Sequence, residues 1–462
     1  MSQKTSSSNL LFEQGFNKTI AEKLPQVLPT LNGKFIPAPG DFYYGMTYGA
    51  NAYYNENALS TFDSTIEVNS DGIARLSNQK LSGLYMDVLT NAWYAFSEET
   101  QRQLDEWNSK AESQIASVLK AFTDYNFKFS DPIPPGGKIE DVFNQLTELY
   151  GPITKNCDNL PVTMPGLKNA LSNYIMAAGK AYKLYSRSMH AIATLNAAKD
   201  NIEEPSAENG GLQINDSDYY VGFDRLPTTN QLIGSLSTDD NSLTVSLSGE
   251  SFNGETCNID IDSRGVFTIP ISGLLNVTLG GSVNIDMFQY SANRTKFSIN
   301  ITYPGVTLVQ NIPLALSNDT SKGWYSENIL REIEAKTNNP HTDGYKLLGG
   351  EYTTDELFGE HGKMNYFKTF VISRQPTVEA TFTNVNVKEL QKVLKKSSNA
   401  GVKLFGFLPI GSASSNYSLS QVDFDDKAQS VTMRFHAPNV TGTTPLANQI
   451  AYIIGGVPEY TD

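Results

Sequence analysis

The spacing of apolar residues changes once along the chain, near residue 205, and this change constrains the fold more than any other feature. Before it, apolar residues recur every three or four positions, as on one face of an α-helix. After it, they alternate with polar residues, as in a half-buried β-strand. Residues 203–211, EEPSAENGG, have the composition of a linker. The sequence therefore predicts an α+β protein, with a helical N-terminal half and a β-rich, sandwich-like C-terminal half.

The clearest helix is predicted over residues 165–202. A row of side chains recurs in it at spacings of three and four, close to the heptad pattern of a coiled coil. The row consists of Leu167, Leu171, Ile175, Ala178, Tyr182, Tyr185, Met189, Ile192 and Asn196. A helix of this length would be about 57 Å long, enough to pack lengthwise against another helix. We expect the row to be buried in a long-helix hairpin or bundle.

The partner helix is predicted between Leu84 and Tyr125. Ser97, followed by two glutamates, can begin its second half as a separate helix, because a hydroxyl cap and early acids complement a helix N-terminus. A shorter helix is expected at 138–150, ended by Gly151-Pro152. Two short helices are expected within the β-rich half, at 327–336 and 387–396.

Residues 274–288, LLNVTLGGSVNIDMF, alternate on both sides of a Gly-Gly pair. A two-residue loop would set apolar residues opposite polar ones, whereas a three-residue loop at 280–282 sets apolar opposite apolar. The predicted pairs are Leu275–Met287, Asn276–Asp286, Val277–Ile285, Thr278–Asn284 and Leu279–Val283. The first arm is predicted to begin at Phe267.

The apolar face of this hairpin suits either a soluble core or a lipid surface. A membrane strand needs alternation over about 9 to 11 residues, and the second arm loses it after Met287. We therefore expect the apolar face to pack into a sandwich core. The residues of that face are Leu275, Val277, Leu279, Val283 and Ile285.

These patterns divide the chain into five segments. They are an N-terminal segment with a short hairpin (1–80), a helical domain (81–204), a linker and lead-in (205–240), a β-rich domain (241–320) and a mixed α/β extension of the β-rich half (321–462).

Charge and cysteine content limit the classes of partner and cofactor. The chain has 49 acidic and 35 basic residues, a net charge of −14, so nucleic acid is not an expected partner. Its 2 cysteines, Cys157 and Cys257, cannot form a disulfide framework or a cysteine-rich zinc module. We predict two buried thiols, and a single bridge between them stays open as the alternative.

The N-terminal residues contain only the short apolar run Leu10, Leu11 and Phe12, which is far shorter than the core of a signal peptide. The expected location is cytoplasmic, or outside the cell by export without a classical signal peptide. No uninterrupted apolar run reaches the ~18 residues of a membrane-spanning helix.

Candidate residues for chemistry gather in residues 349–363, GGEYTTDELFGEHGK. Glu351, Asp355, Glu360 and His361 lie close together between glycines and are the candidate metal ligands, with Glu360 and His361 the candidate acid–base pair. A solvated, turn-rich loop explains the same residues, and none of the 4 histidines has a zinc-ligand spacing. We therefore expect no metal site, and neither a Walker loop nor a dinucleotide fingerprint predicts a cofactor.

Three other segments have the composition of turns between strands. Residues 260–265, DIDSRG, begin like a calcium loop, but Arg264 occupies a ligand position and would repel the ion. Residues 69–74, NSDGIA, and 424–429, FDDKAQ, carry the Asn, Asp and Gly that turns favour.

Few residues of the chain fall in recognisable catalytic or metal-binding motifs, which favours a non-enzymatic, self-associating or surface-binding protein. Its expected partner is another protein or a second copy of the chain, with a membrane surface as a further candidate. Two alternatives stay open: a soluble pore-forming or membrane-perturbing toxin, and a hydrolase whose site is assembled from distant loops.

Overall fold

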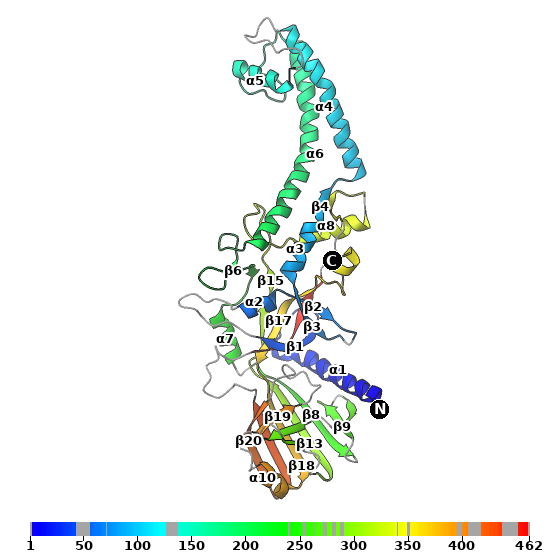
Figure 1. Cartoon of the computed structure of the whole chain (residues 1–462), viewed down its shortest axis with the longest axis vertical. Coiled ribbons are helices and arrows are strands. Elements are labelled where there is room, and N and C mark those ends of the chain that lie inside the picture. Colours follow the sequence, from blue (N-terminus) through cyan, green and yellow to red (C-terminus); the bar gives the residue numbers. More distant parts are fainter. Residues whose placement is uncertain are drawn as a thin grey trace. The chain divides into compact units, whose positions relative to one another are not determined.

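The computed structural model divides into two compact units (Figure 1). Unit 1 comprises Met1–Met86, Asp200–Tyr325 and Asp355–Asp462, and unit 2 comprises Asp87–Lys199 and Ser326–Thr354. Of the residues that the structure describes, 41% are helical and 31% lie in the strands of several sheets, a mixed class consistent with α+β. The structure describes residues 2–42, 56–70, 72–125, 137–238, 241–252, 256–263, 265–270, 275–279, 283–286, 291–339, 341–348, 352–394, 400–404, 417–436 and 451–460.

Unit 2 contains the long helices that the sequence predicts. Its elements are β4 (Ala92–Ala95), α4 (Glu98–Asp124), α5 (Ile139–Tyr150), α6 (Pro165–Glu203, whose last residues belong to unit 1), α8 (Glu327–Asn338) and β16 (Gly344–Leu347). The separate start at Ser97 is confirmed, because the Ser97 hydroxyl accepts a hydrogen bond of 3.1 Å from the Thr100 N–H. The predicted stop at Gly151 is also confirmed, with φ at +76°.

An apolar cluster joins α4, α5 and α6 at one end of unit 2 (Figure 1). Its largest contributions come from Val118 and Phe122 of α4, Leu146 of α5, and Leu167 and Leu171 of α6, all buried. Further along, the Lys180 ammonium of α6 lies 3.9 Å from the centre of the Trp107 ring of α4, a cation–π contact. Figure 1 shows the two long helices side by side.

The start of α4 is tied to the loop before β16. Asp343 accepts a 2.7 Å hydrogen bond from the Ser97 N–H and a 3.1 Å bond from the Thr100 hydroxyl. The Lys336 ammonium donates to the carbonyls of Phe96 and Thr342. These contacts fix the base of α4 against residues more than 230 positions later in the chain.

The predicted burial of the α6 row is wrong from Tyr182 onward. Tyr182, Tyr185, Met189 and Ile192 are 69%, 54%, 54% and 48% exposed. A second row, offset by about one position, is buried instead: Ala170, Ala177, Ala181, Ala191, Leu195 and Ala198. Both rows have heptad spacing, and small side chains let neighbouring elements approach closely. The larger residues made the first row the stronger sequence signal, although packing selects the alanine row.

We expect the two parts of the predicted row to respond differently to truncation. Ile175 is partly buried against the apolar cluster, so Ile175→Ala should lower the free energy of unfolding by about 1 kcal/mol. Tyr182→Ala should change it by no more than ~0.5 kcal/mol, because the ring is largely exposed. Urea unfolding with Lys183→Ala as a control measures both, and an equal loss for Tyr182→Ala would contradict this assignment.

Unit 1 is built on two large sheets. The ten-stranded sheet has the order β10-β9-β8-β13-β18-β21-β20-β19-β11-β12. Its strands are β8 (Leu243–Phe252), β9 (Thr256–Ile261), β10 (Val266–Pro270), β11 (Leu275–Leu279), β12 (Val283–Asp286), β13 (Ser291–Tyr303), β18 (Thr377–Val385), β19 (Ala400–Leu404), β20 (Tyr417–Asp425) and β21 (Ser430–His436). Neighbouring strands are antiparallel, which fits the alternation seen in the sequence.

The predicted hairpin register is confirmed where the structure describes it. β11 pairs with β12 as Asn276↔Asp286, Val277↔Ile285, Thr278↔Asn284 and Leu279↔Val283. The pair Leu275–Met287 lies outside the described residues. The side chains of the hairpin are also outside them, so the burial of its apolar face stays a prediction.

The single long first arm from Phe267 to Leu279 is wrong. The segment forms two strands, β10 and β11, which pair with different neighbours in the sheet. Pro270 is the last described residue of β10, and its nitrogen cannot donate a ladder hydrogen bond.

The inner face of the ten-stranded sheet forms a core with a helix that the sequence analysis missed. Helix α1 (Ser2–Val27) buries Phe12, Phe16, Ile20 and Leu24 in the same cluster as the sheet. Alternate residues of the sheet complete this core: Val245, Leu247, Ile259, Ile299, Ile301, Val378, Phe382, Val431 and Met433. Lys23 joins α1 to the β9–β10 turn through Asp262, at 2.6 Å.

The second sheet has the order β1-β22-β17-β2-β3, with β14 also paired to β17. Its strands are β1 (Ile36–Phe42), β2 (Ser64–Val68), β3 (Ala74–Lys80), β14 (Thr307–Gln310), β17 (Tyr366–Arg374) and β22 (Ala451–Glu459). β22 is buried along nearly its whole length. Gly455 and Gly456 let Phe35 and Phe367 approach its backbone, because a Cβ at either glycine would meet these rings.

The three expected turns all connect paired strands. The β2–β3 turn closes with a 3.0 Å hydrogen bond from the Asn69 N–H to the Ile73 carbonyl. In the β20–β21 turn, Asp425 accepts from the N–H groups of Lys427 and Ala428, each at 2.9 Å. Residues 260–265 connect β9 to β10, although Arg264 lies outside the described residues.

Smaller elements complete unit 1. They are α2 (Glu56–Phe62), α3 (Leu81–Asn91, which continues into unit 2), α7 (Thr229–Ser237), α9 (Thr354–Leu357), α10 (Val387–Leu394) and the short strands β5 (Leu212–Gln213), β6 (Tyr219–Tyr220), β7 (Phe223–Asp224) and β15 (Ile312–Pro313). Of the helices in the described part of the chain, none has both the length and the apolar content needed to cross a membrane.

Candidate functional site

The described site candidates lie on α9 and in the turn that follows it, before β17. Asp355 is exposed in α9, Glu360 and His361 are exposed after it, and Glu351 lies outside the described residues. The Asn365 amide holds the turn by donating to the carbonyls of Gly359 and Glu360, at 2.8 and 3.1 Å. The Glu360 carboxylate lies 3.8 Å from the Lys34 ammonium, an exposed ion pair.

Asp355, Glu360 and His361, the described members of the set, belong to no cluster that could hold a cation. Across the ranges that the structure describes, no group of three or more His, Cys, Asp or Glu side chains could hold a metal ion. Both cysteines are free and buried, as predicted. Burial raises the pKa of the Cys257 thiol, which disfavours its thiolate and hence its use as a nucleophile.

A pocket of about 510 Å³ lies between α1 and the β9–β10 hairpin. Its lining residues are Gly15, Lys18, Thr19, Glu22, Ile261, Gly265 and Phe267. They include one carboxylate and neither a histidine nor a cysteine, so they offer no carboxylate pair and no nucleophile–base pair for hydrolysis. A Cβ at Gly15 would meet the Phe267 ring, so this glycine allows α1 to pack on β10.

A buried carboxylate that sequence analysis missed lies in unit 1. Asp63 accepts hydrogen bonds from the Ser82 N–H at 2.8 Å, the Ser82 hydroxyl at 2.5 Å and the Tyr220 hydroxyl at 3.0 Å. Burial raises the pKa of Asp63, and the hydrogen bonds from Ser82 oppose this shift. Burial of the Tyr220 hydroxyl, together with the nearby Asp63 charge, raises the pKa of Tyr220.

The surroundings of Asp63 indicate a structural role. Its side chain is fully buried and its two oxygens both accept hydrogen bonds at the first turn of α3, so the carboxylate satisfies the exposed donors of a helix N-terminus. Ser82 and Tyr220 lie 19 and 157 positions away in the chain. No local spacing therefore marks Asp63 in the sequence.

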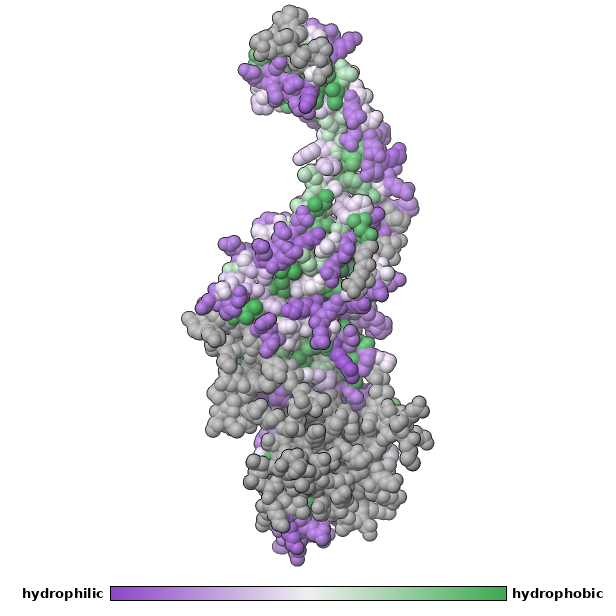
Figure 2. Space-filling model, in the orientation of Figure 1, coloured by the Kyte–Doolittle hydropathy of each residue, from purple (hydrophilic) through white to green (hydrophobic). Residues whose placement is uncertain are grey.

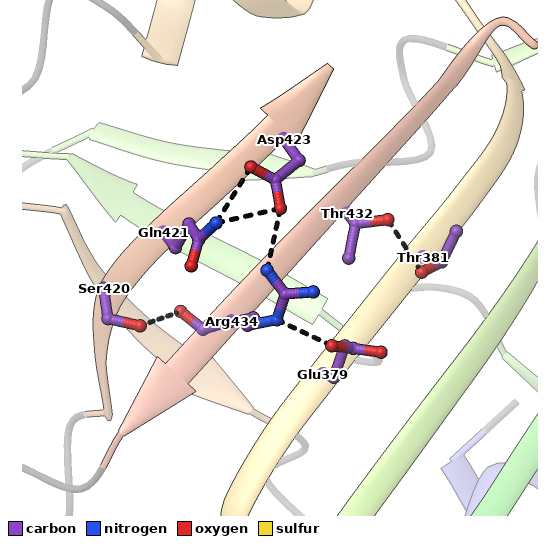
Figure 3. A network of polar contacts seen from close by, with 7 residues as sticks. All are labelled: Glu379, Thr381, Ser420, Gln421, Asp423, Thr432 and Arg434. Carbon is purple, nitrogen blue, oxygen red and sulfur yellow. Dashed lines mark hydrogen bonds and ion pairs between the residues drawn. The ribbon is translucent and has the colours of Figure 1, made fainter. Parts of the chain in front are cut away.

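A polar network covers part of the ten-stranded sheet (Figure 3). Arg434 of β21 donates to Glu379 of β18 and to Asp423 of β20, both at 2.7 Å. Gln421 supports Asp423, and together these hydrogen bonds lower the pKa of the Asp423 carboxyl. The network links three neighbouring strands, and its paired charges leave no free group for catalysis.

The exposed part of the α6 row is the strongest candidate for function. Tyr182, Tyr185, Met189 and Ile192, hereafter the α6 stripe, follow one another at spacings of three, four and three on one side of the helix. In Figure 2, white and green surface lies over α6, whereas hydrophilic purple surface dominates over α4. Residues 165–199 contain 5 basic residues and no acidic residue, although the whole chain is acidic.

The side chains of the stripe are of the types that occur in binding surfaces. Tyrosine and methionine are enriched at protein interfaces, where their large side chains exclude water. Two tyrosines, one methionine and one isoleucine follow one another along one side of a long helix, unlike apolar residues scattered singly. The sequence identified these positions but placed them in the core. No protein-family model, no curated protein and no solved structure matches the chain.

Proposed function

We propose that the protein is a non-enzymatic, self-associating or surface-binding protein whose contact surface is the α6 stripe. One observation carries the proposal: four large apolar side chains in heptad spacing are about half exposed or more. Leaving them in water costs free energy that contact with another helix would recover, at roughly 25 cal/mol per Å² of apolar surface.

The fold supports this use of the stripe. We propose that α4 and α6 form a long-helix hairpin, held by the apolar cluster at one end and by Lys180 over Trp107. Such a hairpin would present the stripe on a rigid element. We also propose sandwich-like packing for the β-rich half, because Val371 and Tyr452 of the six-stranded sheet belong to the same core as the ten-stranded sheet. The proposed location stays cytoplasmic or exported without a classical signal peptide.

A membrane surface is the second candidate partner, and with it the membrane-perturbing toxin. The observation that favours it is the basic composition of α6 beside its apolar stripe, a combination that binds anionic lipid headgroups in other amphipathic helices. The hydrolase alternative stays a prediction without a supporting arrangement of groups among the described residues.

The mass of the protein in solution tests the proposal. Sedimentation of the full chain should show a mass that rises with concentration. The double variant Tyr185→Ser/Met189→Ser should weaken association by about 30-fold, because losing two interface anchors costs roughly 2 kcal/mol.

The matched control is Lys183→Ser/His190→Ser, which changes two exposed residues of the same helix outside the stripe. We expect it to associate like the wild type. A wild-type chain that stays monomeric at every concentration and binds no vesicles of phosphatidylserine would contradict the proposed function. Binding to the vesicles alone would select the membrane candidate.

A further inference from the structure

We infer that the partner of the α6 stripe is the same stripe of a second copy of this chain, with the two helices antiparallel. This inference rests on the proposed function and specifies its partner. It follows from the order of side chains along α6, from the residues that flank the stripe and from the surface that the stripe can bury.

The spacing of the row reads the same in both directions. Ala178, Tyr182, Tyr185, Met189, Ile192 and Asn196 are separated by 4, 3, 4, 3 and 4 positions. A two-fold axis at the level of residue 187 therefore sets Tyr182 opposite Ile192 of the other copy, and Tyr185 opposite Met189. Each layer then combines one aromatic and one aliphatic side chain, so the distance between the helices stays uniform.

A parallel pair would pack less evenly. It would place Tyr182 against Tyr182 of the other copy and Ile192 against Ile192 of the other copy. Large and small pairs of side chains would then require different distances between the helices along one interface. It would also bring Lys180, Lys183 and Arg187 level with their own copies, and like charges at one level repel. In the antiparallel pair only Arg187 is level with itself, and the helix dipoles oppose each other.

The residues beside the stripe suit close contact with another helix. On the side away from the buried alanine row, the next positions in heptad spacing are Gly179, Ser186 and Ala193. All three are small and uncharged, so a second helix can approach without displacing a long side chain or burying an unpaired charge. An acidic partner would find no basic residue at these three flanking positions, whereas a second copy would bring an equally small and uncharged flank to the contact.

The surface available fits a modest dimer. Taking ~200 Å² for each side chain, the exposed fractions of the four stripe residues amount to roughly 450 Å² per copy. Two copies would bury about 900 Å², and the flanking positions bring the total near the ~1,200 Å² at the lower end of stable interfaces. We therefore expect reversible association.

Cysteine cross-linking tests the orientation without altering the stripe. Ala178→Cys and Asn196→Cys face each other only in the antiparallel pair. In that pair each position lies 18 residues from its own copy, about 27 Å along the helix, too far for a disulfide. We expect an oxidised mixture of the two single variants to form a band at twice the chain mass, and neither variant alone to form it.

The controls separate this inference from the proposed function. The wild type, whose two cysteines are buried, gives the background, and adding Tyr185→Ser/Met189→Ser to both variants should abolish the band. If Ala178→Cys alone cross-links, or the mass rises with concentration while the mixture does not cross-link, the inference fails and the proposed function stands. A chain that neither cross-links nor associates overturns both.

Discussion

Replacing Trp324 with alanine is expected to lower the free energy of unfolding of unit 1 by about 3 to 5 kcal/mol. The indole is 1% exposed and packs against the rings of Tyr85, Phe223 and Tyr325, with centroids 6.0, 6.2 and 5.6 Å away. Its ring N–H donates a 2.7 Å hydrogen bond to the Gly222 carbonyl. Truncation removes these contacts and leaves a cavity, although the Gly222 carbonyl keeps the 3.0 Å hydrogen bond that it accepts from the Leu314 N–H.

Urea unfolding of unit 1 measures this effect, and Trp93→Ala, which lies in unit 2, is the control for removing a tryptophan ring from a partly exposed position. Trp93 is 41% exposed in β4, so its truncation should cost far less than that of Trp324. Trp324→Phe retains much of the volume but not the ring N–H and should fall between the two. Equal losses for Trp324→Ala and Trp93→Ala would show that the aromatic cluster does not form.

Replacing Asp63 with alanine should lower the free energy of unfolding of unit 1 by roughly 3 kcal/mol. Three donors, two from Ser82 and one from Tyr220, would lose their acceptor, and each buried unpaired donor costs about 1 to 3 kcal/mol. Relief from burying the carboxylate offsets part of this loss, because that burial is what raises the pKa of Asp63.

Asp319 is the control for this change. It also accepts three hydrogen bonds, from the Ser317 hydroxyl and from the N–H and hydroxyl of Ser321, but it is exposed, so water can replace them. We expect Asp319→Ala to affect unfolding by urea much less. A similar effect of the two substitutions would mean that Asp63 does not hold the start of α3 in a dry site.

Local patterns were sufficient for elements defined by their own residues. Ser97, Gly151 and the 280–282 loop each mark a cap, a stop or a register through chemistry within a few positions, and the first two, together with the described pairs of the hairpin, are confirmed. The helical and β-rich patterns likewise predicted a mixed α and β class. The sandwich and the long-helix hairpin depend on packing between elements, which no single segment encodes.

Strands buried on both faces were harder to predict. β17 and β22 lack clean alternation because both of their faces meet other parts of unit 1, and a continuous apolar run suits a buried helix equally well. Helix α1 was missed because Ser, Thr, Gln and Asn interrupt its apolar row. Its burial depends on the ten-stranded sheet, which begins more than 200 residues later.

The candidate surface was found for the wrong reason. Heptad spacing identified Tyr182, Tyr185, Met189 and Ile192 as one row, but spacing cannot say which of two adjacent rows faces the chain's own core. Asp63 escaped notice because its partners come together only in the folded unit. For the cluster at 349–363, the sequence offered a solvated turn as the alternative to a site, and the described residues there form a turn held by Asn365.

The position of β22 near the end of the chain determines the order in which elements can fold during synthesis. β22 pairs with β1 on one side and with β17 on the other. β1 therefore cannot pair until β22, about 400 residues later, has been synthesised, which takes roughly 20 to 80 s at ordinary rates. The residues of α4, α5 and α6 are contiguous and can meet long before then. We therefore expect α4, α5 and α6 to pack together first, with the stripe already exposed, while the edge of β1 still needs protection from other nascent chains.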